Sequence, residues 1–194
     1  MQTFSSTDTE RNLAVELILE DIPGGGVVEK DDFPTSATGM KEGALLGVDS
    51  DGIYHLTKTA MLANALVASG FNHVVVYNNH EFKAGDLLGY SLGTASGVRI
   101  TSVVASGTGK DVLNLSSNLS IAIAASGLVI ENATSGFNGG GFRYSPVAIA
   151  TNPVDLTNDN NGCGLLVRGR VRTSQLPYFV DATIKALLPL VRFV

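Results

Sequence analysis

KEGALLG at residues 41–47 returns as KAGDLLG at residues 83–89, so the pattern Lys-x-Gly-x-Leu-Leu-Gly occurs twice. Glycine adopts the backbone conformations that tight turns need, and an apolar run bounded by glycines is typical of a short buried strand. We therefore predict that each copy is a tight turn leading into a buried strand, and that the two turns are equivalent corners of a barrel. Chance similarity in a Gly- and Leu-rich chain is the alternative, and without a third copy the pattern does not indicate a solenoid.

Short apolar runs separated by Gly, Asp and Asn continue on both sides of these copies. The strongest is Phe71 to Tyr77, and Asn78-Asn79 after it predicts a hairpin turn with residues 80–82 as the returning strand. Turn signals at this spacing are typical of a barrel or sandwich and not of βαβ units. The other predicted strands are residues 44–48, 53–56, 86–90, 98–104, 112–115, 119–125, 128–130, 144–150 and 164–171.

Two segments have helical features. Residues 57–69 are Ala-rich, and their apolar positions fit either a helix or a strand that crosses the core. Near the C-terminus, Pro177 in a first turn predicts a helix at about residues 177–188, which Pro189 ends. Residues 190–194 are expected to form a last strand. We thus predict a mainly β fold, with a barrel-like core of short strands, an extended N-terminal arm and a short C-terminal helix.

The two ends of the chain carry opposite charge. The first 32 residues contain eight Asp or Glu and two Lys or Arg. We interpret residues 1–33 as an acidic arm with one strand and residues 34–194 as a single β-rich domain; a solvated edge segment is the alternative interpretation of the arm. The apolar positions that alternate in the arm, as in a strand, are Leu13, Val15, Leu17 and Leu19, with Ile18 out of phase. The basic residues of the C-terminal end are Arg168, Arg170, Arg172, Lys185 and Arg192.

Composition narrows the class of protein. Of the 194 residues, 44% are hydrophobic and only 16% are charged, against about 25% charged in an average soluble domain. Low charge without a membrane-spanning run suggests a surface that partners cover, although a well-packed β protein is the alternative. The net charge of -5 argues against a nucleic-acid surface. The polar N-terminus has no signal-peptide pattern, so we expect a protein made and kept in a cytoplasm.

Catalytic and metal-binding patterns are weak. Cys163 is the single cysteine and has no nearby His that would activate it. His80 and Glu81 are adjacent, so on a strand they point to opposite faces and do not chelate with His73. The glycines at residues 107–109 and 139–141 lack P-loop spacing. We predict no enzyme activity, no metal and no cofactor.

Several of these segments resemble a known family. The stretch from Met61 to Leu88, the Gly43 to Gly52 segment and the Leu165 to Leu188 tail resemble tailed-bacteriophage capsid decoration proteins of the lambda type and the auxiliary capsid and head-fibre base proteins of phages. The resemblance implies a β-tulip fold, trimers at symmetry axes of a capsid, and an N-terminal arm that adds a strand to the shell. Residues 107–110 and 136–141 have no counterpart in that family and are either contacts for a fibre or host surface, or inert.

The prediction for function is a virion structural protein that binds the outside of a phage capsid and stabilises or decorates the shell, assembled in the host cytoplasm. Its expected partners are the major capsid protein, further copies of itself in a homotrimer, and a head-fibre protein, without nucleic acid or membrane. A receptor- or glycan-binding β module of a fibre or spike is the alternative, which the low aromatic content disfavours. The residues predicted to contact partners are Leu13, Val15, Leu17, Leu19, Arg168, Arg170 and Arg172.

Overall fold

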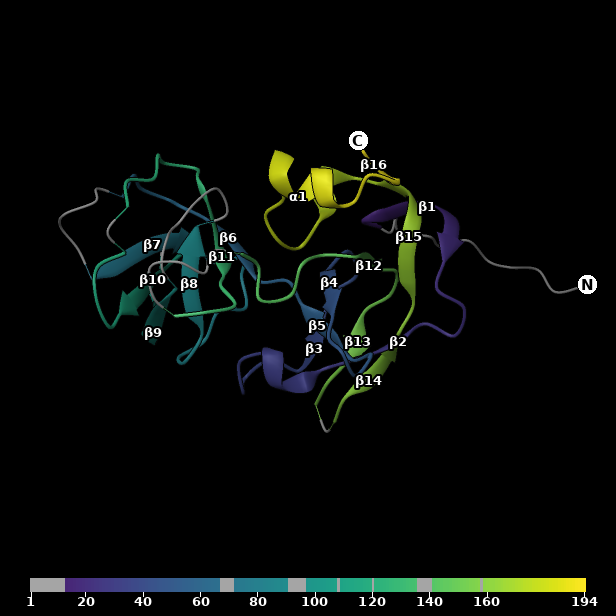
Figure 1. Ribbon diagram of the computed structural model, residues 1–194, viewed down its shortest axis with the longest axis horizontal. Helices are drawn as coiled ribbons and strands as arrows, with labels where there is room; N and C mark the ends of the chain where they lie inside the picture. The colour runs from purple at the N-terminus through teal and green to yellow at the C-terminus, as the bar shows by residue number, and fades with distance from the viewer. Residues whose placement is uncertain are drawn as a thin grey trace, which may run out of the picture.

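The structure is a computed structural model that describes residues 13–66, 72–90, 97–107, 109–119, 121–135, 141–157 and 159–194. It confirms a mainly β fold with a short helix near the C-terminus, α1 (Ala182–Leu187). Figure 1 shows two lobes side by side, a smaller lobe of curled strands and a larger one that contains both the first and the last strands. Residues of the smaller lobe are inserted between two parts of the larger lobe in the sequence.

An eight-stranded sheet forms the larger lobe, and its alternating residues face two apolar clusters. Leu46 and Leu165 lie in one cluster, whereas their neighbours Leu45 and Leu166 lie in the other, with Ile184 of α1. Both faces of this sheet are therefore covered in the middle. In spatial order the strands are β1 (Val15–Asp21), β15 (Leu165–Val171), β12 (Ala148–Ala150), β4 (Leu45–Val48), β5 (Tyr54–Leu56), β2 (Gly26–Val28) and β14 (Asn161–Cys163), while β16 (Val191–Phe193) also pairs with β15. A separate pair is made by β3 (Gly39–Met40) and β13 (Val154–Asp155).

A six-stranded sheet forms the smaller lobe and closes into a barrel. Its order is β6 (Thr59–Met61), β11 (Leu128–Glu131), β8 (Leu87–Tyr90), β9 (Val98–Ala105), β10 (Lys110–Leu115) and β7 (His73–Tyr77). The two ends of this order meet, because Leu62 after β6 bridges Val76 of β7 and the amide of Ala63 donates to the carbonyl of Val75 at 2.9 Å. Leu88, Ile100 and Leu113 are among the side chains fully buried inside.

The two lobes share strand β11. Val129 points into the barrel core, whereas Leu128 and Ile130 pack in the cluster around Ile149 of β12 and Ile184 of α1. A strand buried on both faces needs apolar residues at every position, which explains the uninterrupted Leu-Val-Ile run.

The two copies of Lys-x-Gly-x-Leu-Leu-Gly form equivalent corners, as predicted, but they lie one in each sheet and not in a single barrel. Gly43 and Gly85 have φ angles of 83° and 102°, a region that favours glycine. In the first corner the amide of Gly43 donates to the carbonyl of Ala150, and the amide of Ala150 donates back to the carbonyl of Ala44, both at 2.9 Å. Gly85, Asp86 and Ile100 repeat this exchange in the second corner, at 2.9 and 2.8 Å.

The hairpin prediction at Asn78-Asn79 is wrong. β7 pairs with β10 along its whole length, from Lys110 opposite Tyr77 to Asn114 opposite His73, and residues 80–82 are not in a strand. Nδ1 of His80 instead accepts a hydrogen bond from the amide of Phe82 at 3.1 Å, which fixes a turn there.

The structure refines the predictions for two other segments. The ambiguous stretch 57–69 contains strand β6 and no helix as far as residue 66, and residues 67–69 lie outside the described part. The C-terminal helix is shorter than expected because Asp181 caps it: its carboxylate accepts from the amide of Ile184 at 3.0 Å. Tyr178 before the cap is buried in the core, and strand β16 confirms the predicted last strand.

Candidate functional site: the β1 edge of the large sheet

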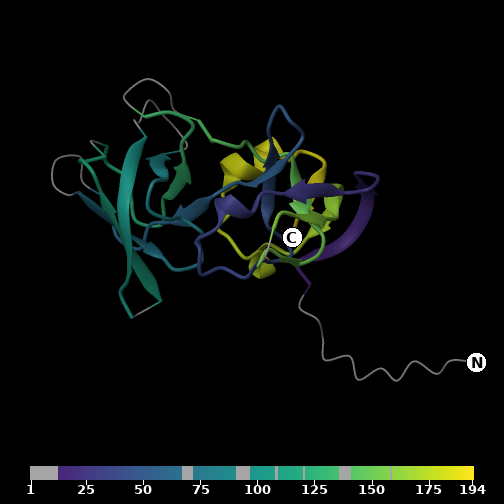
Figure 2. The same cartoon turned by 90° about the horizontal axis from the view of Figure 1, so that it is seen from below.

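Among the residues that the structure describes, strand β1 forms an open edge of the large sheet. It pairs with β15 on one side and stands first in the strand order. Figures 1 and 2 show it at the end of the molecule that is farthest from the barrel. An edge strand presents unpaired backbone groups that can accept a further strand. The barrel offers a contrast, since its closure leaves β6 and β7 in contact.

The middle of this strand exposes apolar side chains. Leu17, Ile18 and Leu19 are 44%, 49% and 62% exposed. Three consecutive large apolar residues on an edge strand are an aggregation hazard unless a partner covers them. The β1 edge, defined as residues 15–21 with these three side chains at its centre, is therefore our candidate functional site.

Beyond Val15 the strand is exposed on both faces, and its pairing is irregular. The pairing of β1 with β15 shifts register between Val15 and Leu17, between Ile18 and Glu20, and again before Asp21. Each bulge breaks the alternation of a regular strand and increases its local twist. Leu17 and Ile18 pair in unbroken register, so they point to opposite faces and are both exposed. Of the alternating apolar residues within β1, only Val15 is buried.

Opposite charges of the two chain ends meet inside one chain. Glu16 of β1 lies 2.7 Å from Nε of Arg170 and 3.3 Å from an Nη of Arg172, and Glu20 lies opposite Arg168 in the register. At Glu16 the opposite charges of the two chain ends therefore pair within one chain, across β1 and β15.

On the other side of β15 from β1, Leu190 is a further exposed apolar residue. The amide of Gly169 donates to the carbonyl of Leu190 at 3.3 Å, and Leu190 is 59% exposed. On the other side of the same glycine, a Cβ atom at position 169 would lie only 2.1 Å from the carbonyl oxygen of Leu17. The absence of a side chain at Gly169 thus lets β15 lie close to Leu17 of β1.

The structure brings the seven predicted contact residues together on one antiparallel pair. Leu13 precedes β1 and is exposed, Leu17 and Leu19 lie on its exposed part, and Val15 is buried and not available to a partner. The arginines are on β15 or directly after it: Arg168, Arg170 and Arg172. The strand expected in the N-terminal arm is thus part of its own chain's sheet. Residues 1–12 lie outside the described part of the chain.

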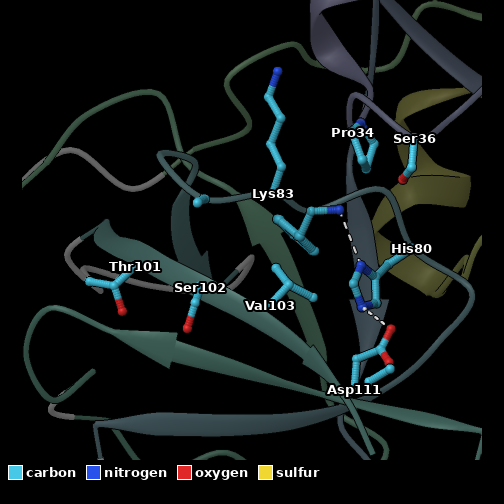
Figure 3. Close-up of a pocket in the computed structure, with 11 residues that line it drawn as sticks. Pro34, Ser36, His80, Lys83, Thr101, Ser102, Val103 and Asp111 are labelled. Carbon is cyan, nitrogen blue, oxygen red and sulfur yellow. Dashed lines mark hydrogen bonds and ion pairs between the residues drawn. The ribbon is translucent and has the colours of Figure 1, made fainter.

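A pocket of about 540 Å³ lies beside His80 between the loop at Pro34 and strand β9. Figure 3 shows the ring of His80 facing Asp111, with Thr101, Ser102 and Val103 along one side. Nε2 of His80 is 3.2 Å from the carboxylate of Asp111. Burial lowers the pKa of His80, against the opposing effect of Asp111. Since Nδ1 accepts from the amide of Phe82, the proton of the neutral ring is on Nε2 and faces Asp111.

Other chemistry in the described residues is limited. Cys163 is buried in the large sheet, and burial raises its thiol pKa to about 11, so it is not a thiolate near neutral pH. In the part of the chain that the structure covers, no three His, Cys, Asp or Glu side chains are grouped to hold a metal ion. No helix there is long and apolar enough to cross a membrane.

Comparisons with protein families, with curated proteins and with solved structures found no match for this chain.

Proposed function

We propose that this chain is a virion structural protein that binds the outside of a phage capsid and stabilises or decorates the shell. The observation that carries the proposal is the run Leu17-Ile18-Leu19, exposed on an open edge strand. A surface of this kind favours burial against a partner, because each side chain gains free energy when it leaves water. The resemblance of residues 61–88 and 165–188 to capsid decoration proteins supports the choice of a capsid as the partner.

The proposed occupant of the β1 edge is an extended segment of the major capsid protein. Backbone hydrogen bonds to a strand edge give affinity, and side-chain contacts give specificity. Glu20 and Asp21 at the end of β1 are exposed, so the matching segment would be apolar with a basic residue at one end. The bulges of β1 distort the edge, which disfavours an arbitrary strand and favours a partner of matching shape. The same proposal places three copies together on the shell.

A glycan-binding module is less well supported. The pocket beside His80 has hydroxyl groups from Thr101 and Ser102. Its aromatic side chain, Phe82, is only 2% exposed, whereas sugar stacking needs an accessible aromatic face.

Virion composition tests the proposal. Particles whose genome encodes this chain would be purified by density gradient, and their proteins quantified by mass spectrometry. We expect this chain in a fixed, stoichiometric ratio to the major capsid protein, and expect mild denaturant to release it before the shell opens. Its absence from purified particles would overturn the proposal.

A further inference from the structure

Three charged side chains are buried together where the lobes meet. Lys58, Asp86 and Glu131 are 2%, 3% and 2% exposed. Lysine and acidic residues are almost never this deeply buried unless they are paired, and a buried ion pair often stabilises a fold less than apolar residues of the same volume do. Charge pairing alone therefore does not explain why these three residues are buried here.

Strand register brings these three residues to one point. β11 is antiparallel to β6 on one side and to β8 on the other. The end of β11 therefore lies beside the starts of both neighbours. Glu131 is the last residue of β11, Lys58 directly precedes β6 and Asp86 directly precedes β8. The amide of Glu131 donates to the carbonyl of Lys58 at 3.1 Å, which locks this arrangement.

The reactive atoms are in contact. Nζ of Lys58 lies 2.7 Å from Oδ2 of Asp86 and 3.8 Å from Oε2 of Glu131. The other oxygen of Glu131 accepts from Arg143 at 2.7 Å. Within the described residues, Oε2 makes no hydrogen bond of its own. An amine, a carboxyl group and a second carboxyl with an open oxygen are thus held within reach of one another.

We propose that Lys58 and Asp86 join in an intramolecular isopeptide bond, formed by the folded chain itself with Glu131 as the proton carrier. A proton passes from the Lys58 ammonium to the Asp86 carboxylate, which leaves a neutral amine beside a carboxylic acid. The Nζ lone pair then attacks Cγ of Asp86, and Glu131 takes a proton from the nitrogen. Glu131 returns this proton to the departing hydroxyl as the C–O bond breaks. The products are one amide and one water, with no change in oxidation state.

Contact and burial both favour this step. Fixed contact between the reacting groups replaces a bimolecular encounter, which is worth a large factor in rate. Burial also raises the pKa of Glu131, against the charges of Lys58 and Arg143, so its carboxyl is suited to hold a proton during the reaction.

The bond would join the start of β6 to the start of β8 across β11. It would tie the small barrel covalently at the point where the chain enters it from the large lobe. This inference depends only on contacts inside the fold and does not depend on the proposed capsid role.

Intact mass of the purified full chain tests the proposal. Amide formation releases one water, so we expect a mass about 18 Da below that of the sequence, retained after complete denaturation. Trypsin would leave Lys58 uncleaved, and the digest would contain residues 42–83 joined to residues 84–99. A folded chain with the full sequence mass would overturn the proposal.

Three variants assign the reaction to these residues. Lys58→Arg should restore the full sequence mass, and Glu131→Gln should slow or abolish the loss of water. Lys83→Arg is the matched control, because the Lys83 amide also contacts Asp86, at 2.9 Å, yet its side chain is not a reactant; it should keep the loss. A cyclised aspartate at Asp51-Gly52 would also lose water, so a mass loss that persists in Lys58→Arg would overturn the bond. A full loss in Glu131→Gln would overturn the role of Glu131. If Lys58→Arg does not fold, the tryptic digest of the unmodified chain still tests the bond: residues 42–83 joined to 84–99 support it, and their recovery as separate peptides overturns it.

Discussion

The two Lys-x-Gly-x-Leu-Leu-Gly corners have the same backbone hydrogen bonds, but their side chains contact different parts of the molecule. In the first, the carboxylate of Glu42 accepts from the amide of Val15 at 2.9 Å and so holds the start of the β1 edge. In the second, the equivalent position of Glu42 is Ala84, and the residue two places further on is Asp86, buried against Lys58. The position that matches Asp86 in the first corner is Ala44, a core residue.

The two corners therefore belong to two different kinds of sheet, one with an open edge and one whose end strands meet. The first corner supports an open sheet whose edge ends in exposed apolar residues. The second corner supports a barrel whose strands meet and whose entry is fixed by Lys58 and Asp86. The backbone pattern alone specifies the corner, while two side chains in each copy decide what it supports.

Core and edge truncations should differ most. Leu113 is fully buried in the barrel, and Leu113→Ala should cost about 2–5 kcal/mol in the free energy of unfolding. Leu19 is 62% exposed on β1, and Leu19→Ala should cost less than about 0.5 kcal/mol. Urea unfolding of both variants measures the difference. A cost at Leu19 equal to that at Leu113 would contradict the assignment of β1 as an uncovered edge.

The two corner glycines should differ by a smaller amount. Gly85→Ala adds a Cβ that meets nothing within 4 Å, so it should cost only the strain of a positive φ, about 1–2 kcal/mol. Gly43→Ala carries the same strain, and its Cβ would also lie 2.7 Å from Cβ of Ala14. Crowding of this kind adds about 1–3 kcal/mol. Thermal unfolding compared at one pH tests this ranking, which equal costs would refute.

The smallest effect concerns pH and is confined to the barrel. His80 faces Asp111, with Asp86 and Lys58 nearby, and burial lowers its pKa below the ordinary value of 6.5. Below about pH 6.5 the unfolded chain therefore binds a proton that the folded chain resists, and stability falls with decreasing pH by at most about 1.4 kcal/mol per unit. Above that pH, His80 is neutral in both the folded and the unfolded chain, so it no longer changes the free energy of unfolding with pH.

His80→Asn isolates this contribution. Its side-chain oxygen can still accept from the amide of Phe82, but it does not titrate. Urea unfolding between pH 5.5 and pH 7.5 should show a shallower slope for the variant than for the unmodified chain. Identical slopes would mean that His80 accepts a proton in the fold as readily as in the unfolded chain.

Tight turns were predictable from sequence, because glycine conformations act over a few residues, whereas the Asp181 cap of α1 was missed. The corners at Gly43 and Gly85 follow from their φ angles. The partner of β7 could not be predicted, because its strand β10 lies beyond the intervening strands β8 and β9. Residues Lys58, Asp86 and Glu131 gave no signal, since only the register of β11 brings them together.

The candidate site was predicted in part. Alternating apolar residues predicted the β1 strand, and a separate strand was predicted at residues 164–171, but not that the two pair. The bulges of β1 depend on its pairing with β15, which the sequence pattern does not contain. The apolar Ile18, out of phase with the alternation, was the available signal of an irregular strand.

Binding to capsid shells tests the central claim that the β1 edge joins this chain to a particle. Shells assembled without the chain would be mixed with it and sedimented, using the unmodified sequence, a Leu17→Glu/Leu19→Glu variant, and Val104→Glu. Val104 is the matched control, since it is 50% exposed on β9 of the closed barrel. We predict that the unmodified chain and Val104→Glu sediment with shells and that the edge variant, folded by circular dichroism, stays in solution. Sedimentation of the edge variant at the level of the unmodified chain, or of none of the three, would contradict the account.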